Sequence, residues 1–359
     1  MYSIKIYTEE KEIWEIMKLF QEYVDEEYLT MYQTEVWNRI ISHAIGKGRV
    51  RLFTLMQGSE IVMASVGYMY PLRGNYYWLY LPRGPIVHRK YTKEFQEVLD
   101  VFLEMVGKHL TNKCVWIRLD PLVQIGSLYP HGSLKKAHKN FHPDNSLVLD
   151  LRLSESELLL QMKEKGRYNI RLSEKKGVKV SGFVYEKEGY KKIFGDLDLK
   201  SPLDAYVEIM QETTTRDRFS SHSKKYLNNF LQESSGHGLL LLAEFHGEVI
   251  SGGIFYYDER TFYYYYGASS NNQRNLMSPY ALQWSAICYA KNYTNCRHYD
   301  FLGIANSIED SKDPLYGVTQ FKTKFGGKIV RTGGTFEYVT NSFLYAFVRL
   351  VKWTLGLFK

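Results

Sequence analysis

The chain has 359 residues, of which 45% are hydrophobic and 24% charged, a composition typical of a globular protein with more than one domain. These values exclude a disordered chain, a fibrous repeat and a polytopic membrane protein. The 46 basic and 39 acidic residues leave a net charge of +7, which favours polyanionic partners. Three cysteines without a C-x-x-C pair, and an N-terminus without a signal-peptide pattern, lead us to expect a cytoplasmic protein with no metal and no cofactor.

The first part of the chain alternates helix-like and strand-like segments. Apolar residues recur at helical spacing over residues 9–28 and 92–110, and they alternate or cluster as in strands over residues 51–56, 61–69, 76–81 and 115–119. Helices flanking strands that are mostly joined by hairpins predict an α+β unit.

The same order of elements starts again after residues 122–146, which we interpret as a linker or covering loop. A strand at 147–153 precedes a capping box, Ser154-x-x-Glu157, that opens a helix predicted to run to about Lys176. Helices at 203–214, 223–233 and 278–292 and strands at 238–245, 248–257, 261–267 and 299–302 follow. His246-Gly247 is predicted to form a hairpin turn. This repetition predicts two similar α+β domains with a cleft between them.

Tyrosine is unusually frequent, with 30 residues. Residues 76–80 and 262–266 are predicted to be strands whose successive rings point to opposite faces. Such rings could also stack on bases or sugars.

A basic stripe lies on the helix predicted around residues 163–179. Lys163, Arg167, Arg171 and Lys175 are spaced four apart and share one face, while an apolar stripe lies on another. The stripe suits contact with phosphates, and a solvated surface helix is the alternative.

The segment Gln273-Arg-Asn-Leu-Met-Ser278 lies where a strand leads into a helix. In acetyltransferases of the GNAT class, glycines at this junction let backbone N–H groups hold the pyrophosphate of coenzyme A. Those glycines are missing here, which favours a GNAT-like fold without the coenzyme A site; an ordinary strand-to-helix loop is the alternative.

The segment Phe321-Lys-Thr-Lys-Phe-Gly-Gly327 could place one ammonium against a carbonyl or phosphate of a ligand. A strand end with solvated lysines is an equally good interpretation of the spacing.

Taken together, these segments resemble the Fem family (FemABX), the aminoacyl transferases that build peptidoglycan cross-bridges. The matching residues occur in the family's order over most of the chain: Gln33-x-x-x-Trp37, Leu81-Pro-Arg-Gly-Pro-Ile86, Trp116-Ile-Arg-Leu-Asp-Pro121, Lys165-x-Arg-Tyr-Asn-Ile-Arg171 with Gly177-Val178, Thr213-Thr-Thr-Arg216, Tyr266-Gly-Ala-Ser269, Asp300-Phe-Leu-Gly-Ile304 and Phe321-Lys-x-x-Phe-Gly-Gly327. The stretch between Arg171 and Arg216 is too short for the coiled-coil arm of larger members, so the chain resembles the compact FemX-like type.

The resemblance implies two GNAT-like (acyl-CoA N-acyltransferase-like) domains, an aminoacyl-tRNA donor, and UDP-MurNAc-pentapeptide or lipid II as acceptor. Residues 1–146 would form the acceptor-side domain, with 337–359 as a candidate addition, and 147–336 the aminoacyl-tRNA side. The tRNA would meet Lys163, Arg167, Arg171 and Lys175.

Individual roles follow from the same resemblance. Thr214 and Arg216 would hold the acceptor's diphosphate, with Tyr265 or Tyr266, Arg83 and Trp37 as further substrate-binding residues. Asp120 would lie near the acceptor amine, and Phe321 and Lys322 near the reacting ester. The family often has a lysine where this chain has Ile41, and Arg39 or His43 are candidates to replace it.

In the expected mechanism, Asp120 orients the acceptor ammonium and accepts its proton, and Lys322 stabilises the oxyanion on the ester. Asp120 could instead only cap the turn before Pro121. Two other functions stay open on the sequence: a CoA-dependent N-acyltransferase, and a non-catalytic protein that binds RNA or a precursor.

The C-terminal segment, residues 341–359, is apolar almost all round but carries central cations, which is unfavourable for a membrane-spanning helix. We expect it to pack onto the first domain; insertion into the inner leaflet of the membrane is the alternative.

Overall fold

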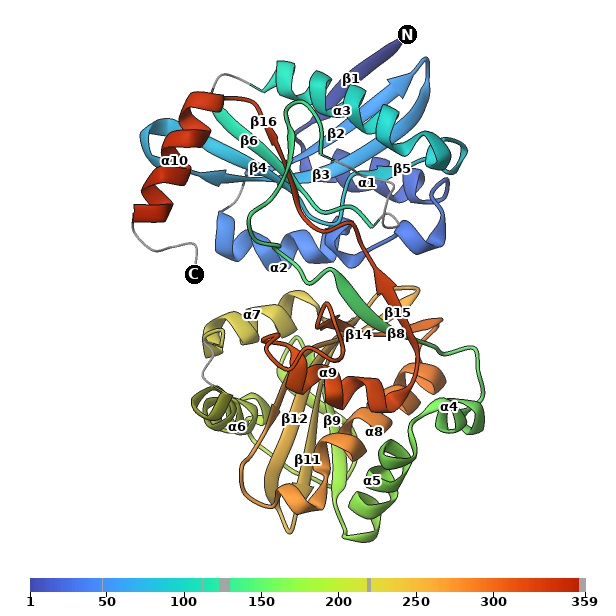
Figure 1. The fold of residues 1–359 in the computed structure, drawn as a ribbon. Helices are drawn as coiled ribbons and strands as arrows, with labels where there is room; N and C mark the ends of the chain where they lie inside the picture. Colours follow the sequence, from blue (N-terminus) through green and yellow to red (C-terminus); the bar gives the residue numbers. More distant parts are fainter. Residues whose placement is uncertain (47, 111–112, 123–129, 218–220, 355–359) are drawn as a thin grey trace. The chain divides into compact units, whose positions relative to one another are not determined.

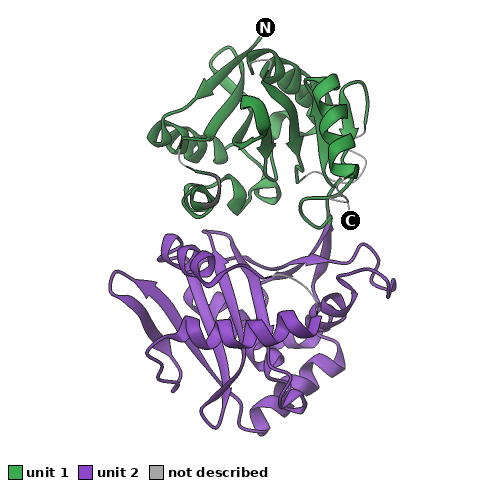
Figure 2. Ribbon diagram, turned by 90° about the vertical axis from the view of Figure 1, so that its left-hand side faces the viewer, with its two compact units in different colours: residues 1–144, 331–359 green, residues 145–330 purple. Residues whose placement is uncertain are grey.

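The computed structural model describes residues 1–46, 48–110, 113–122, 130–217 and 221–354 and forms two compact units. Unit 1 consists of residues 1–144 and 331–359, and unit 2 of residues 145–330 (Figure 2). Each unit is built around one mixed β-sheet covered by helices (Figure 1).

Unit 1 begins with a strand, two helices and a run of antiparallel strands. Its elements are β1 (Tyr2–Tyr7), α1 (Glu10–Gln21), α2 (Glu35–Ile45), β2 (Val50–Gln57), β3 (Glu60–Pro71), β4 (Tyr77–Leu81), β5 (Ile86–Val87), α3 (Phe95–His109), β6 (Cys114–Leu119), β7 (Leu134–Lys136), β16 (Phe336–Val339) and α10 (Ser342–Thr354). Short 3-10 turns lie between them, among them η2 (Met31–Gln33) and η4 (Arg89–Glu94).

Unit 2 repeats this plan. Its elements are β8 (Asn145–Asp150), α4 (Glu155–Gln161), α5 (Glu164–Lys175), β9 (Lys179–Glu186), β10 (Gly189–Phe194), α6 (Pro202–Asp217), α7 (Lys224–Glu233), β11 (Gly238–Phe245), β12 (Glu248–Tyr257), β13 (Thr261–Ser269), η5 (Arg274–Leu276), α8 (Ser278–Tyr293), β14 (His298–Ile304), α9 (Tyr316–Lys322), η6 (Thr323–Phe325) and β15 (Lys328–Arg331).

The two sheets have the same strand order. Unit 1 runs β1-β2-β3-β4-β6-β16-β7, and unit 2 runs β9-β11-β12-β13-β14-β8-β15 with β10 added at its edge. In each sheet the fourth and fifth strands are parallel (β4 with β6, β13 with β14), and a helix, α3 or α8, joins them. The predicted α+β class is therefore confirmed. The order of elements does repeat, but the counterpart of β1 is β9 and not the strand predicted over residues 147–153, which takes the position of β16.

The sheet of unit 2 is covered on both faces, as the residues of β11 show. Its run Leu239–Ala243 is apolar without interruption and fully buried, as expected for a strand covered on both faces. Leu239, Leu241 and Ala243 join the core with residues of α5 and α8. On the other face, Gly252 of the neighbouring β12 approaches Leu242 and Tyr206, so α6 packs there.

The hairpin predicted at His246-Gly247 is confirmed. Phe245 pairs with Glu248, which leaves a two-residue loop, and both loop residues have positive φ, 52° and 83°. Two positive φ values are the mark of a type I′ turn, whose twist matches that of the strands it joins.

One predicted helix, from Ser154 to about Lys176, is instead two helices. Met162 and Lys163 adopt extended backbone angles between α4 and α5. Arg167 of α5 connects the two helices across the break: its guanidinium donates a hydrogen bond to the carbonyl of Met162 at the end of α4. The predicted capping box of Ser154 and Glu157 is present at the start of α4.

Two further segments differ from the sequence-based expectations. Residues 122–146, predicted as a linker or covering loop, contain β7 and reach β8 at their end, while 123–129 lie outside the described residues. Residues 179–194, for which no element was predicted, form the β9–β10 hairpin. Because this stretch and α6 fill the chain from Arg171 to Arg216, all of it described, no coiled-coil arm is present.

The C-terminal helix α10 packs on unit 1. Tyr345, Leu344 and Val348 contact Val115 and Trp116 of β6. Of the predicted segment 341–359, residues 355–359 lie outside the described part. No helix among the described residues has both the length and the apolar run that a membrane span requires.

Candidate functional site

Asp120 lies directly after β6 in unit 1 and is 1% exposed. Its Oδ1 accepts the backbone N–H of Arg83 at 2.7 Å, and the Tyr80 hydroxyl donates to Oδ2 at 3.1 Å. Its Oδ2 also lies 2.7 Å from His142 Nδ1. Burial raises the pKa of this carboxyl, but the bond to His142 and the nearby Arg83 guanidinium outweigh burial and lower the pKa below its usual value. Asp120 is therefore a buried carboxylate that stays charged.

His142 completes this group and was missed by the sequence analysis, as was Tyr80. The Asp120 carboxylate accepts the Nδ1 proton, which leaves Nε2 as the basic nitrogen of the ring. The ring also contacts Tyr32, with centroids 4.6 Å apart, and its side chain is 19% exposed. The alternation along β4 could have indicated Tyr80, whereas nothing in the pattern of residues 122–146 marks His142.

The Gln33-x-x-x-Trp37 motif supports this group by packing rather than presenting both side chains to a ligand. Gln33 is fully buried: its Nε2 donates to the carbonyls of Val66 and Pro82, and its Oε1 accepts the N–H of Val66. The Trp37 ring meets Tyr32 edge-on at 4.7 Å, and Tyr32 in turn contacts His142. Gln33 thus fixes the backbone on which the site is built.

Arg83 belongs to the turn that follows β4. It has a positive φ of 51°, and its guanidinium donates to the Pro143 carbonyl at 3.1 Å. The next residue, Gly84, lies so close to Gln33 and Ser65 that a Cβ there would be 2.4 Å from Ser65 Oγ. These contacts explain why the motif Leu81-Pro-Arg-Gly-Pro-Ile86 needs its glycine.

Lys322 lies at the C-terminal end of α9 in unit 2 and is buried, 7% exposed. Its Nζ donates to the Gly303 carbonyl at 2.7 Å and lies 5.9 Å from the centre of the Tyr264 ring. Burial lowers the pKa of Lys322 to about 8, although nearby Asp300 acts in the opposite direction. The expectation of a strand end with solvated lysines is wrong, because the segment is helical and this lysine is enclosed.

Phe321 and the glycines of the same motif have packing contacts. The Phe321 ring lies 5.1 Å from that of Tyr280 and 5.4 Å from that of Phe325. A Cβ at Gly327 would come within 2.6 Å of the Val148 carbonyl oxygen. These packing contacts hold the backbone on either side of Lys322 against the sheet.

The end of α6 is tied to the end of β13. The Thr213 hydroxyl donates to the Ser269 carbonyl at 3.0 Å, and Arg216 Nη1 donates to the same carbonyl, also at 3.0 Å. The other side of the Arg216 guanidinium pairs with Asp217 through two contacts of 2.8 Å, which raises the pKa of Arg216. The Thr214 hydroxyl donates within its own helix to Gln211.

Tyr265 and Tyr266 do not alternate as predicted. Ile254 pairs with Tyr266 but Phe255 pairs with Tyr264, so Tyr265 is the extra residue of a β-bulge. The bulge brings both rings against Phe230 of α7, with centroids 4.9 and 5.9 Å away. A cluster of aromatic rings results between β13 and α7.

The basic stripe of α5 is exposed at three of its four positions. Lys163, Arg171 and Lys175 are exposed, whereas Arg167 is half-buried at the end of α4. Tyr168, 60% exposed, adds an aromatic ring to the same helix.

The Gln273–Ser278 junction keeps an unusual backbone. Gln273 and Met277 have positive φ values of 59° and 56°, a region that glycine adopts without strain. The predicted residues thus lie in separate places: Asp120, Arg83 and Trp37 in unit 1; Thr214 and Arg216 at the end of α6; Tyr265 and Tyr266 on β13 against α7; and Phe321 with Lys322 at the end of α9.

The family model described as the FemAB family matches residues 122–248 and 246–353, more than half of the chain. The chain belongs to the FemAB family. The aminoacyltransferase FemA of Staphylococcus aureus is 24% identical over 374 aligned positions, which cover 82% of this chain and 87% of that protein. Membership of the family makes the chain an aminoacyltransferase of peptidoglycan biosynthesis, and the resemblance found in the sequence is confirmed.

Solved structures agree on the fold. The crystal structure of FemX matches with a TM-score of 0.74 at 18% identity, covering 96% of this chain and 99% of that one. A tandem GNAT protein from the clavulanic acid biosynthesis pathway matches with a TM-score of 0.53 at 10% identity, covering 95% and 99% of the two chains. The expected fold of two GNAT-like units is confirmed.

Proposed function

We propose that this FemAB protein moves an amino acid from aminoacyl-tRNA to the stem-peptide amine of a peptidoglycan precursor, either UDP-MurNAc-pentapeptide or lipid II. The observation that carries the proposal is the pair formed by Asp120 and His142, with Oδ2 and Nδ1 2.7 Å apart. The reaction needs a charged acceptor ammonium to be held and then deprotonated, and the pair offers one group for each task.

The chemistry divides between the two side chains. A lysine-type ammonium has a reference pKa of about 10.4, so it must lose a proton before it attacks the ester. The lowered pKa of Asp120 makes it a weak base but a good counter-ion for the ammonium. His142, oriented by Asp120, takes the proton on Nε2. This division modifies the expected mechanism, in which Asp120 did both.

Lys322 is the proposed oxyanion partner. As the amine adds to the ester carbonyl, negative charge develops on the carbonyl oxygen, and a buried ammonium stabilises such a charge more strongly than an exposed one. Collapse of this intermediate then breaks the ester C–O bond and releases the tRNA ribose oxygen, which takes up the proton removed from the amine. The bond from Nζ to the Gly303 carbonyl supports a fixed position for this ammonium. Phe321 would hold Lys322 in place by packing.

The remaining predicted roles stay part of the proposal. Thr214 and Arg216 would hold the acceptor's diphosphate, which requires Arg216 to exchange its pairing with Asp217 for the phosphate oxygens. Arg83 and Trp37 in unit 1, and separately Tyr265 and Tyr266 in unit 2, are further proposed substrate-binding residues. Lys163, Arg167, Arg171 and Lys175 would contact the tRNA backbone. The site would lie on the cytoplasmic side, where charged tRNA is present.

Transfer of radiolabelled amino acids from a pool of charged tRNAs tests the proposal. UDP-MurNAc-pentapeptide and lipid II are offered in parallel, each with and without RNase, and coenzyme A with an acyl donor serves as a separate arm. Label on either acceptor that disappears with RNase is the expected result and identifies the acceptor. A folded protein that labels neither acceptor would refute the proposal, and acyl transfer from coenzyme A would replace it.

A further inference from the structure

Helix α10 has two apolar faces, and among the described residues one of them packs on the sheet of unit 1 while the other is exposed. Leu344, Tyr345 and Val348 lie against the sheet of unit 1. On the opposite face Phe343 is 80% exposed and Trp353 72% exposed, and Phe347, Leu350 and Val351 are exposed as well. Exposed aromatic and aliphatic side chains that form one stripe on a helix indicate a binding surface.

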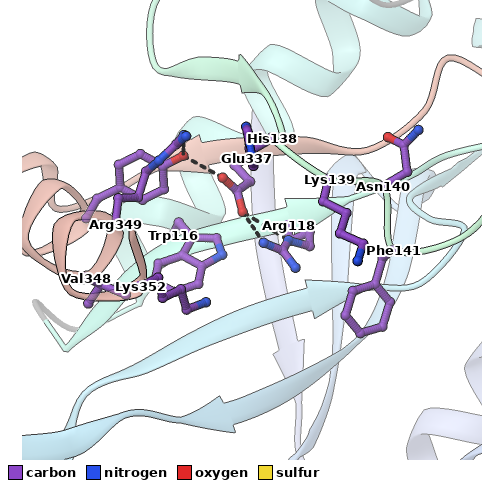
Figure 3. Close-up of a pocket in the computed structure, with 11 residues that line it drawn as sticks. Trp116, Arg118, His138, Lys139, Asn140, Phe141, Glu337, Val348, Arg349 and Lys352 are labelled. Atoms are coloured by element: carbon purple, nitrogen blue, oxygen red, sulfur yellow. Dashed lines mark hydrogen bonds and ion pairs between the residues drawn. The ribbon is translucent and has the colours of Figure 1, made fainter. Parts of the chain in front are cut away.

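A cavity of about 350 Å³ lies between α10, the β6–β16 part of the sheet and residues 138–141 (Figure 3). Arg118, Lys139, Arg349 and Lys352 line it together with a single carboxylate, Glu337. Among the described residues that line the cavity, four cations and one anion leave a net charge of +3, with His138 counted as neutral. The cavity therefore suits an anionic group.

The charges are only partly neutralised inside the protein. Glu337 accepts from Arg118 Nε at 3.0 Å and from the Tyr345 hydroxyl at 2.5 Å, and Arg349 donates to the same hydroxyl at 3.1 Å (Figure 3). Among the residues that the structure describes, Lys139 and Lys352 form no ion pair. Burial and the neighbouring Arg118 and Arg349 lower the pKa of Lys352, as expected where cations crowd one another.

We propose that α10 docks on a bilayer that carries anionic phospholipids, with its apolar face in the interface and a lipid headgroup phosphate in the adjoining cavity. Helix α10 contains no acidic residue over Ser342–Thr354, and its exposed face combines phenylalanines with a tryptophan, the combination that interfacial helices use. Guanidinium and ammonium groups in the cavity complement a phosphate monoanion. The charge complementarity favours a phospholipid surface over an uncharged apolar partner.

The inference goes beyond the proposed transfer reaction and does not depend on it. Docking would bring the protein to the surface where a lipid-linked acceptor resides, whereas transfer to soluble UDP-MurNAc-pentapeptide needs no bilayer. Loss of docking and loss of transfer are therefore separate outcomes.

Sedimentation of the full chain with vesicles tests the docking. Vesicles of phosphatidylcholine alone are compared with vesicles that also contain phosphatidylglycerol. The double variant Phe347→Ser/Trp353→Ser removes exposed apolar side chains, and Lys352→Gln removes a cavity charge. Matched controls are Leu19→Ser, an exposed leucine of α1, and Lys5→Gln, an exposed lysine of β1.

The chain should bind the anionic vesicles more tightly than the neutral ones. The double variant should lose at least about tenfold in vesicle affinity, and Lys352→Gln about fivefold on anionic vesicles only. Both controls should bind as the unchanged chain does. Circular dichroism and thermal unfolding show whether each variant is folded.

Three results would overturn the proposal. The first is a full chain that binds neither kind of vesicle, and the second is a double variant that binds as well as the control. The third is a dimer, seen by analytical ultracentrifugation, that the double variant dissociates, because a second copy would then occupy the apolar face.

Discussion

Asp120 combines two properties that exposed carboxylates lack. It is buried, and yet three donors and the nearby Arg83 guanidinium keep it charged. A carboxylate held in this way is an anchor for cations and for the imidazole of His142, since its own proton affinity is low. In the proposed mechanism Asp120 therefore serves as the counter-ion and His142 as the base.

Replacing either member of the pair tests this division. His142→Gln should lower kcat by roughly 100-fold or more, because the proposed base is lost. Asp120→Asn should lower kcat and also raise KM for the amine acceptor. The double variant should be little worse than the more damaging single variant, since the two residues act as a unit.

His109→Gln is the matched control, since His109 is an exposed residue of α3. An unchanged kcat in His142→Gln would assign the base elsewhere.

Burial of Lys322 should have a measurable effect on the free energy of unfolding. Its pKa is about 8 in the folded protein against a usual value of 10.5, so the unfolded chain binds more protons between these pH values. The free energy of unfolding should rise as the pH increases from 8 to 10.5. Lys322→Met should be more stable than the unchanged chain at pH 7, by up to about 3 kcal/mol, and the difference should shrink as the pH rises through this range. Urea unfolding at several pH values measures it.

Lys322→Ala provides the functional counterpart. Its transfer rate should fall by about 100-fold or more if the ammonium stabilises the oxyanion. If Lys322→Met unfolds at higher urea concentration and keeps a normal transfer rate, the buried ammonium contributes neither to stability nor to catalysis.

Individual residues could be predicted where a motif or a strand end marks them. Asp120 follows an apolar strand and precedes a proline, and Lys322 lies in a recognisable motif. His142 could not be predicted, because it lies 22 positions after Asp120 and no pattern in the sequence links the two residues. The pairing of Arg216 with its own neighbour Asp217 was equally hidden, since adjacent residues in a helix do not usually face each other.

At the scale of elements, the break between α4 and α5 shows how packing overrides helical spacing. The apolar and basic stripes continue through residues 155–176, so the periodicity alone predicts one helix. In the structure the backbone is extended at Met162 and Lys163, where the N–H of Lys163 donates to the Lys324 carbonyl at 3.0 Å. That hydrogen bond joins the break to the motif that carries Lys322.

Two Gly→Ala substitutions should change the free energy of unfolding in opposite directions. Gly166 of α5 has no room for a side chain, because a Cβ would lie 2.5 Å from the Lys324 carbonyl oxygen, whereas nothing lies within 4 Å of a Cβ at Gly317 in α9. Gly166→Ala should therefore lower the free energy of unfolding by about 2 kcal/mol or more. Gly317→Ala should raise it by up to about 1 kcal/mol, the helix propensity difference. Chemical denaturation measures both, and equal effects would contradict this packing.

Most elements could be predicted from local patterns, and the exceptions have physical causes. The His246-Gly247 hairpin was predictable because a tight turn between two apolar strands is a local feature. The bulge at Tyr265 was not, because it depends on how β12 and β13 pair and not on the tyrosine pattern itself. The β9–β10 hairpin was missed because three of its outer-strand residues, Lys191 to Ile193, are exposed and carry little apolar signal.

At the scale of the whole molecule, the α+β class and the repeated order of elements were predictable, but the origin of one strand in each sheet was not. The sixth position is filled by β16, from the end of the chain, in unit 1 and by β8, from the middle, in unit 2. Short strands such as these pair with partners far away in sequence. Their place in a sheet therefore cannot be read from local periodicity.

Unit 2 is continuous in sequence and unit 1 is not, which predicts different behaviour of fragments. A fragment of residues 145–330 contains nearly all of its sheet, so it should fold alone with a cooperative unfolding transition. A fragment of residues 1–144 lacks β16 and leaves β6 and β7 without their shared neighbour, so it should aggregate or stay partly unfolded. Circular dichroism and thermal unfolding of both fragments measure this. A stable, monomeric 1–144 fragment would contradict it.

The place of β16 between β6 and β7 also has a consequence for synthesis on the ribosome. When residue 144 has been made, the unit 1 sheet still lacks its sixth strand, and the ribosome must add all of unit 2 before that strand exists. Unit 2 can therefore finish folding while the sheet of unit 1 still lacks its sixth strand. A chain that stops before Phe336 would leave one edge of β6 unpaired. Premature termination near the C-terminus should therefore destabilise unit 1 strongly, even though the missing residues lie more than 200 positions after Asp120.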